Sequence, residues 1–348
     1  MSDLAEIERF EHDGRATGTS VGLRRITPVL CPVVYPFLLQ TLSWLLVSAH
    51  GSTSPEGPAL WFAVGGSLLL GLGVMGAAFA FERTQPDVRS RAAAHLAFAT
   101  PSLFVGFNNA ANLVHSPELA TIAWPMFWAA VAVVVLTSRK PQRAASAIEA
   151  NRHRRLGIAH GISASFIVVL FVAPHLANHM TGLFSGAAHI EFMKAARQVY
   201  RAPAFEPLLL SLVAFQVASG ALLVRRRLRA TSDIFGSLQT MTGVYVGIYF
   251  LAHLIAVFGA RYSGTETNWN WLTNNDHSML VSLSNLRLIG HYWVGPIAIA
   301  THLGCGLRLV LRQHNFSAVF ADAAPRVAMA AGVIVSSMIL VALLGARV

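Results

Sequence analysis

The stretch that decides the fold is RRLGIAHGISASFIVVLFVAPHLANH, at residues 154–179. After its two leading arginines it contains no Asp, Glu, Lys or Arg, and apolar residues fill most of its positions. The hydrocarbon core of a bilayer is about 30 Å thick, so a helix needs about 20 apolar residues to cross it. This stretch therefore predicts a membrane-spanning helix over residues 157–178.

Runs of the same kind recur along the chain, which has 348 residues and is 54% hydrophobic and only 12% charged. Such a composition exceeds what one soluble core needs. The runs lie at residues 28–49, 59–81, 92–113, 119–137, 157–178, 204–224, 237–259, 289–311 and 327–345. The sequence therefore predicts an all-α integral membrane protein with about nine transmembrane helices.

The charge and the two cysteines exclude several classes of protein. A formal net charge of +10 suits a nucleic-acid partner in a soluble protein, but here the basic residues lie almost entirely between apolar runs, so we expect no nucleic acid. Cys31 and Cys305 form no CxxC or CxxCH motif. That pattern argues against a disulfide scaffold, a thiolate metal cluster and a c-type haem. The N-terminus has no signal-peptide pattern.

The basic residues also predict the orientation. Cytoplasmic loops are enriched in Lys and Arg, and nine spans with a cytoplasmic N-terminus leave only six of the 26 Lys and Arg outside. Those six are Lys194, Arg197, Arg201, Arg261, Arg287 and Arg347. We expect an N-in, C-out protein. The basic loop at residues 138–155 separates a four-span region of unknown role, residues 1–150, from a five-span region, residues 151–348. The loop itself is either a topogenic signal at anionic lipid or a docking surface for a partner.

Histidine is the side chain best placed for chemistry inside the membrane, because no predicted span has an Asp or Glu in its middle. Two histidines at equal depth on facing helices can hold a b-type haem iron from both sides. His175 and His253 lie at similar distances from the outer ends of their spans. A simpler role also stays open, in which each histidine is hydrogen-bonded to a neighbour. Pro174 predicts a kink beside His175, because it leaves the carbonyl of Leu170 without its helical donor.

A second, unequal pair lies nearer the cytoplasmic side. His302 and Gln216 are at matching depth, and a glycine follows each four residues later, Gly306 and Gly220. These glycines leave a side-chain-free spot one turn away, which suits either the edge of a flat macrocycle or close packing of two helices. Five further histidines are candidates for quinone binding or proton exchange, or are simply solvated: His160, His179, His189, His277 and His291.

In order and spacing, residues 154–348 resemble the five-helix cytochrome b membrane anchor of the succinate dehydrogenase and fumarate reductase family. The opening stretch resembles that family's first helix, LQTMTGVYVGIYFLAHL at residues 238–254 its third, and HYWVGPIAIATHLGCGLRLVL at residues 291–311 its fourth. The resemblance implies one haem b between His175 and His253. It matches His302 to a ligand of an inner haem, but Gln216 stands where the second inner histidine is expected. The inner site is then empty, held by His302 alone, or rebuilt with another residue.

The resemblance further implies that this chain transfers electrons and that catalysis belongs to other subunits. A flavoprotein and an iron–sulfur subunit on the cytoplasmic side would exchange electrons with membrane quinone through the haem, since this chain has no Rossmann glycine fingerprint and no cysteine cluster. We expect a bacterial inner membrane as its location. Two other functions stay open: a free-standing haem and quinone redox protein, and a haem-free transporter or assembly scaffold. Residues 1–150 resemble no known family.

Overall fold

The computed structural model describes residues 2–51, 54, 56–85, 87–137, 147–229, 233–273 and 283–348, and the side chains of these except residues 2–24, 50, 147–152 and 284. The described residues form helices and no strand. The elements are α1 (Ser2–His50), α2 (Gly57–Glu82), α3 (Val88–Phe98), α4 (Thr100–Leu113), α5 (Glu118–Leu136), α6 (Ala147–Ile167), the π-helix η1 (Val168–Val172), α7 (Ala173–Thr181), α8 (Gly186–Tyr200), α9 (Phe205–Arg227), α10 (Ile234–Tyr262), α11 (Trp269–Thr273), the short η2 (Leu283–Asn285), α12 (Leu286–Gln313) and α13 (Ala318–Leu343).

Eight helical runs in the described residues are long and apolar enough to cross a membrane. They are part of α1 (Arg25–Ala49), α2, α5, the run from α6 through α7 (His153–Thr181), α9, α10, α12 and α13. The composition and the long apolar runs predicted this architecture. The chain is an all-α integral membrane protein.

The remaining predicted span, residues 92–113, is not a single helix. It divides at Ala99 into α3 and α4, of 11 and 14 residues. Pro101, in the first turn of α4, has no N–H to donate to the carbonyl of Ala97, and the Thr100 hydroxyl donates to that carbonyl instead over 2.7 Å. The expectation of an unbroken ninth helix was wrong because this proline and its threonine neighbour end α3 in the middle of the apolar run.

Together, α3 and α4 still extend from one end of the bundle to the other. At one end Arg25 of α1 pairs over 2.9 Å with Asp87, the N-cap of α3, and also donates to the carbonyl of Val135 in the last turn of α5. At the other end, Leu113 of α4 lies beside Gly259 of α10. The broken pair therefore occupies the place of the ninth predicted crossing.

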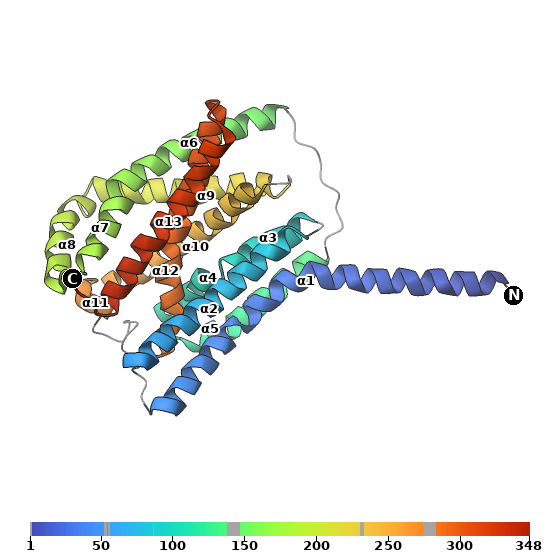
Figure 1. Ribbon diagram of the computed structural model, residues 1–348, viewed down its shortest axis with the longest axis horizontal. Coiled ribbons are helices and arrows are strands. Elements are labelled where there is room, and N and C mark those ends of the chain that lie inside the picture. Colours follow the sequence, from blue (N-terminus) through green and yellow to red (C-terminus); the bar gives the residue numbers. More distant parts are fainter. Residues whose placement is uncertain are drawn as a thin grey trace.

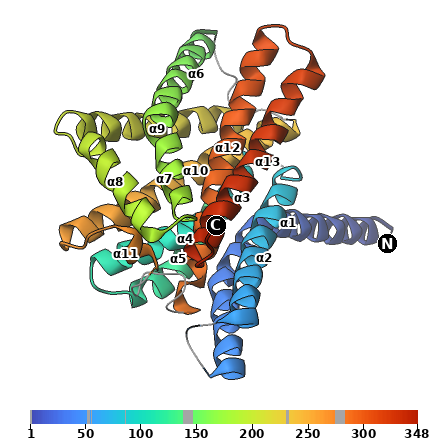
Figure 2. The same cartoon turned by 60° about the vertical axis from the view of Figure 1, so that its left-hand side comes forward.

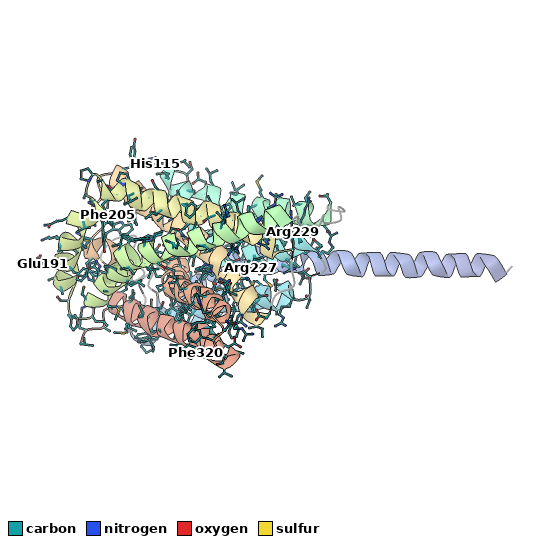
Figure 3. The ribbon with its side chains drawn as sticks, turned by 90° about the horizontal axis from the view of Figure 1, so that it is seen from above. His115, Glu191, Phe205, Arg227, Arg229 and Phe320 are labelled. Atoms are coloured by element: carbon teal, nitrogen blue, oxygen red, sulfur yellow. The ribbon has the colours of Figure 1, made fainter. Side chains whose placement is uncertain are left out.

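The ends of the bundle can be followed in Figure 3. Phe205, at the start of α9, lies at one end near Glu191 of α8, whereas Arg227 and Arg229 lie at the opposite end. The arginine-rich end is the one that the charge pattern predicts to face the cytoplasm. The N-in, C-out orientation stays a prediction.

Helices from both predicted regions pack into one bundle. α12 runs beside α13, and α1 beside α2 (Figures 1 and 2), while α4 packs against α10 and α12. One apolar cluster joins Tyr35 of α1 to Ile289 of α12, and a second joins Trp128 of α5 to Tyr245 of α10. The functional division near residue 150 stays a prediction, but the two regions share their apolar cores. Residues 138–146 of the basic loop lie outside the described residues.

Small residues bring α12 and α13 into close contact. A Cβ atom added to Gly304 would lie 2.6 Å from the Cβ of Ala328 and 2.9 Å from the Cα of Pro325. One added to Gly332 would lie 3.0 Å from the Cα of Ile297. Helices in lipid associate through van der Waals packing more than through the hydrophobic effect. These two glycines therefore let the pair pack backbone to backbone.

The run from α6 to α7 is irregular where the sequence predicts a kink. Between the two α-helices lies the π-helical turn Val168–Val172, and Pro174 follows in the first turn of α7. A π turn accommodates one extra residue and occurs often at functional sites. The proline thus changes the helix directly before His175.

The connector after α7 forms a short helix. Ser185 caps this helix, α8, because its hydroxyl accepts from the N–H of Ala188 over 2.9 Å. Trp269, in α11, is only 4% exposed. Its ring packs so closely on Gly182 and Gly186 that a Cβ at either position would overlap it.

Candidate functional site

A cluster of histidines lies on α7, α8, α10 and α12, and α7 and α8 gather with α11 at one end of the bundle (Figure 1). Its rings come from four helices and are His175, His179, His189, His253 and His291. The ring centres of His175 and His253 are 6.1 Å apart, with their planes at 71°. α7 and α10 therefore bring together the two histidines that the sequence paired by depth.

Aromatic rings support both members of this pair. Phe171, one turn before His175, stacks on its imidazole with the ring centres 5.1 Å apart and the planes at 16°. Tyr249 stacks on His253 in the same way, with the centres 5.9 Å apart and the planes at 7°. The ring centre of Tyr249 is in turn 4.5 Å from the ring centre of His291 of α12. These contacts fix the orientation of the two imidazoles through neighbouring side chains.

Buried polar atoms without a partner surround the same pair. Within the described residues, the Asn178 amide oxygen and the Nδ1 atoms of His179 and His189 are buried and have no hydrogen-bond partner. The ring of His179 is 4.8 Å from that of His175. A buried polar atom without a partner is costly. The three atoms are therefore available to the polar groups of a bound molecule.

His189 lies on α8, outside the predicted membrane spans, and is held neutral. Burial and the positive charge of Arg197 lower the pKa of His189 from 6.5 to about 4. The Asn178 amide nitrogen is 3.3 Å from its Nε2. As the pH falls from about 6.5 toward 4, the unfolded chain takes up a proton at His189 that the folded chain does not, so stability falls in that range and is unaffected above it.

His189→Gln keeps the size of this side chain but cannot be charged. We expect the thermal unfolding midpoint of the detergent-solubilised protein to fall by a few degrees less between pH 7 and pH 5 in this variant than in the wild-type chain. Circular dichroism scans at the two pH values measure the difference. Identical pH dependence in both proteins would show that His189 does not titrate in this way.

A second pair of imidazoles lies nearer the arginine-rich end of the bundle. The ring centres of His160 on α6 and His302 on α12 are 6.3 Å apart, with their planes at 82°. The sequence paired His302 with Gln216 by depth, but the structure brings its ring close to that of His160. His160 had been grouped with the histidines suited to quinone binding or proton exchange.

In each ring of this second pair, the Nδ1 atom makes a hydrogen bond. The His302 Nδ1 atom is 2.8 Å from the backbone carbonyl oxygen of Gln239, so it carries the proton and donates. The His160 Nδ1 atom is 2.8 Å from the hydroxyl of Ser219. That hydroxyl donates to the carbonyl of Phe215 over 2.6 Å, so it accepts from His160. Both imidazoles are thus held in the tautomer that leaves Nε2 as a free acceptor.

Gln216 has a structural contact with α6. Its amide nitrogen donates to the carbonyl of His160 over 2.8 Å and to the hydroxyl of Ser163. A Cβ at Gly220 would lie 3.5 Å from the His160 ring, and one at Gly306 would lie 3.8 Å from the Gln239 amide, so neither position is in tight helix packing.

Gly243, which the sequence analysis did not single out, is in tighter contact. A Cβ there would lie 2.7 Å from the His302 ring. Glycine is therefore required at Gly243 for His302 to hold its position.

The depth argument does not find His160 from the sequence. His160 lies three residues from the inner end of its predicted span, 157–178, whereas His302 lies nine residues from the inner end of 289–311, a difference of about 9 Å along a helix axis. Gln216 lies eight residues from the inner end of its span, so depth selects Gln216 instead. Depth alone also does not say which helices are neighbours across the bundle.

The described residues contain no group of three or more His, Cys, Asp or Glu side chains able to hold a metal ion. Cys31 and Cys305 are both free thiols, as their spacing predicts. His277, a further candidate of the sequence analysis, lies outside the described residues.

The fold and these pairs define an integral membrane protein with histidines buried between its helices. No family model, curated protein or solved structure matches the chain.

Proposed function

We propose that this chain is a membrane b-type cytochrome that carries electrons between a succinate dehydrogenase or fumarate reductase-like complex and membrane quinone. The observation that carries the proposal is the pair His175 and His253, whose ring centres are 6.1 Å apart on α7 and α10. A metal–imidazole bond is about 2 Å long and the ring centre lies about 1 Å beyond the nitrogen, so two imidazoles on opposite sides of one metal have ring centres about 6 Å apart. The measured distance fits one iron between the rings.

The surroundings of the pair also fit haem. Haem iron needs only two axial ligands from the protein, which suits a site built from pairs. The flat macrocycle is apolar and its carboxylates are polar. Aromatic side chains flank both imidazoles, and the unpartnered Nδ1 atom of His189 would be free to donate to a carboxylate of the group.

When bound, haem b supplies a one-electron couple between its ferric and ferrous forms. The chain's residues would determine the position of the haem and its reduction potential. His175 and His253 would hold the group through their imidazole nitrogens, and Phe171 and Tyr249 fix the orientations of these rings by stacking. Burial and axial ligand identity are the main means by which a protein sets a haem potential.

The partners follow from the resemblance of residues 154–348. A flavoprotein and an iron–sulfur subunit would dock at the arginine-rich end, which carries Arg225, Arg226 and Arg229 on the surface. That end is predicted to face the cytoplasm of a bacterium, with the protein in the inner membrane. Quinone would exchange electrons with the haem from within the bilayer.

Affinity purification of the full chain from its native membranes in a mild detergent tests the partners. We expect flavin and iron–sulfur absorbance to co-elute with the chain, and succinate or a quinol analogue to reduce the haem. A haem-containing chain that elutes alone and is reduced only by the quinol would favour a free-standing redox protein. A folded chain without haem would overturn the proposal in favour of a transporter or scaffold.

A further inference from the structure

We propose that His160 and His302 form a second bis-histidine haem site, nearer the arginine-rich end of the bundle. The proposal depends on the proposed function only in that the chain binds haem b. The first observation is the distance between the ring centres, 6.3 Å, which meets the same requirement of about 6 Å for two imidazoles that share one metal ion.

The hydrogen bonds of the two rings are those of metal ligands. Metal-binding histidines nearly always donate the proton of their second nitrogen to a backbone carbonyl, a carboxylate or water, which fixes the tautomer and raises the basicity of the ligating nitrogen. His302 donates from Nδ1 to the carbonyl of Gln239, and His160 donates from Nδ1 to the hydroxyl of Ser219. Each ring is left with Nε2 as an unprotonated lone-pair donor.

The two rings come from helices that are not close neighbours. α6 packs mainly against α9, so His160 and His302 extend toward each other across the bundle. Next to each ring is a glycine, Gly243 beside His302 and Gly220 beside His160, so no side chain at either position occupies the space beside the imidazole.

This assignment gives Gln216 a role other than that of a ligand. Its amide nitrogen donates to the carbonyl of His160 and to Ser163, so it holds the segment of α6 that carries His160. His160 and His175 then serve two different sites from one continuous helix, about 22 Å apart along its axis. A chain with both sites can pass electrons across the membrane between its two faces.

The test uses the full chain purified with its native haem. We expect about two haems per chain, and we expect His160→Ala and His302→Ala each to remove about one, with the loss of one component in a redox titration followed by visible absorbance. The matched control is His314→Ala, at the exposed end of the same helix as His302. It is expected to keep both haems.

A second variant tests ligation by His160 through a change of potential, so the result does not depend on haem loss, which misfolding could also cause. Methionine is also an axial ligand and raises the haem potential relative to histidine. His160→Met should therefore keep the inner haem while the midpoint potential of one component moves upward. The other component should stay where it is in the wild-type chain.

The outcomes separate this inference from the proposed function. One haem per wild-type chain, lost in His175→Ala and retained in His160→Ala, would overturn the inner site and leave the proposed function intact. A chain without haem would overturn both. An unchanged redox titration in His160→Met would contradict ligation by His160 even if two haems are present.

Discussion

Replacing either His175 or His253 with alanine is expected to remove the haem between α7 and α10, a loss of about one haem per chain. Each side chain supplies one of the two axial nitrogens that the 6.1 Å pair presents, and alanine has no ligand atom to replace it. Haem extracted per polypeptide and the amplitude of the reduced-minus-oxidised spectrum measure the loss. The two variants should lose the same spectral component.

Two control variants make this result specific. His179 lies one turn after His175 and its ring is only 4.8 Å away, so His179→Ala perturbs the same region without removing a proposed ligand. Gln216→Ala removes hydrogen bonds to α6 but no ligand. Both should retain the haem of the His175 and His253 pair. Equal haem retention in all four variants would contradict the assignment.

Gly304→Leu is expected to have the largest effect on stability. A Cβ at this position would already lie 2.6 Å from Ala328 and 2.9 Å from the backbone of Pro325, so a leucine must push α13 away from α12. Overpacking typically costs about 1–3 kcal/mol and sometimes more, and we expect a value at or above the upper end, since backbone atoms cannot repack. Unfolding by a denaturing detergent, followed by circular dichroism, measures the change.

Gly76→Leu is the matched control, because nothing lies within 4 Å of a Cβ at that exposed position of α2. Its stability should change by no more than about 0.5 kcal/mol. If Gly304→Leu were as stable as this control, α12 and α13 would not be packed backbone to backbone as described. The two variants have the same change of residue and differ only in what surrounds it.

The sequence predicted those parts of the fold that depend on hydropathy and local chain chemistry. Eight of the long apolar runs form spanning helices, and Pro174 follows an irregular turn. The break at Ala99 was missed because apolar content along residues 92–113 does not reveal that Pro101 frees a carbonyl. The burial of Trp269 could not be predicted, because it depends on Gly182 and Gly186, which are far from it in sequence.

For the candidate site, the sequence could predict the depth of a residue in the membrane but not its position across the bundle. Depth paired His175 with His253, and the structure brings those rings together. Depth also paired His302 with Gln216 and could not find His160, which lies nearer the inner end of its predicted span. The bundle brings the ring of His160 to 6.3 Å from that of His302, while the Gln216 amide donates to the backbone of α6.

The most direct test of the central claim is a reduced-minus-oxidised visible spectrum of the purified full chain, with haem and iron quantified per polypeptide. The account predicts a b-type spectrum with bis-histidine character, one haem for the pair on α7 and α10 and a second for the pair on α6 and α12. A correctly folded chain that binds no haem would contradict the account, because the paired imidazoles would then serve only to hold the helices together.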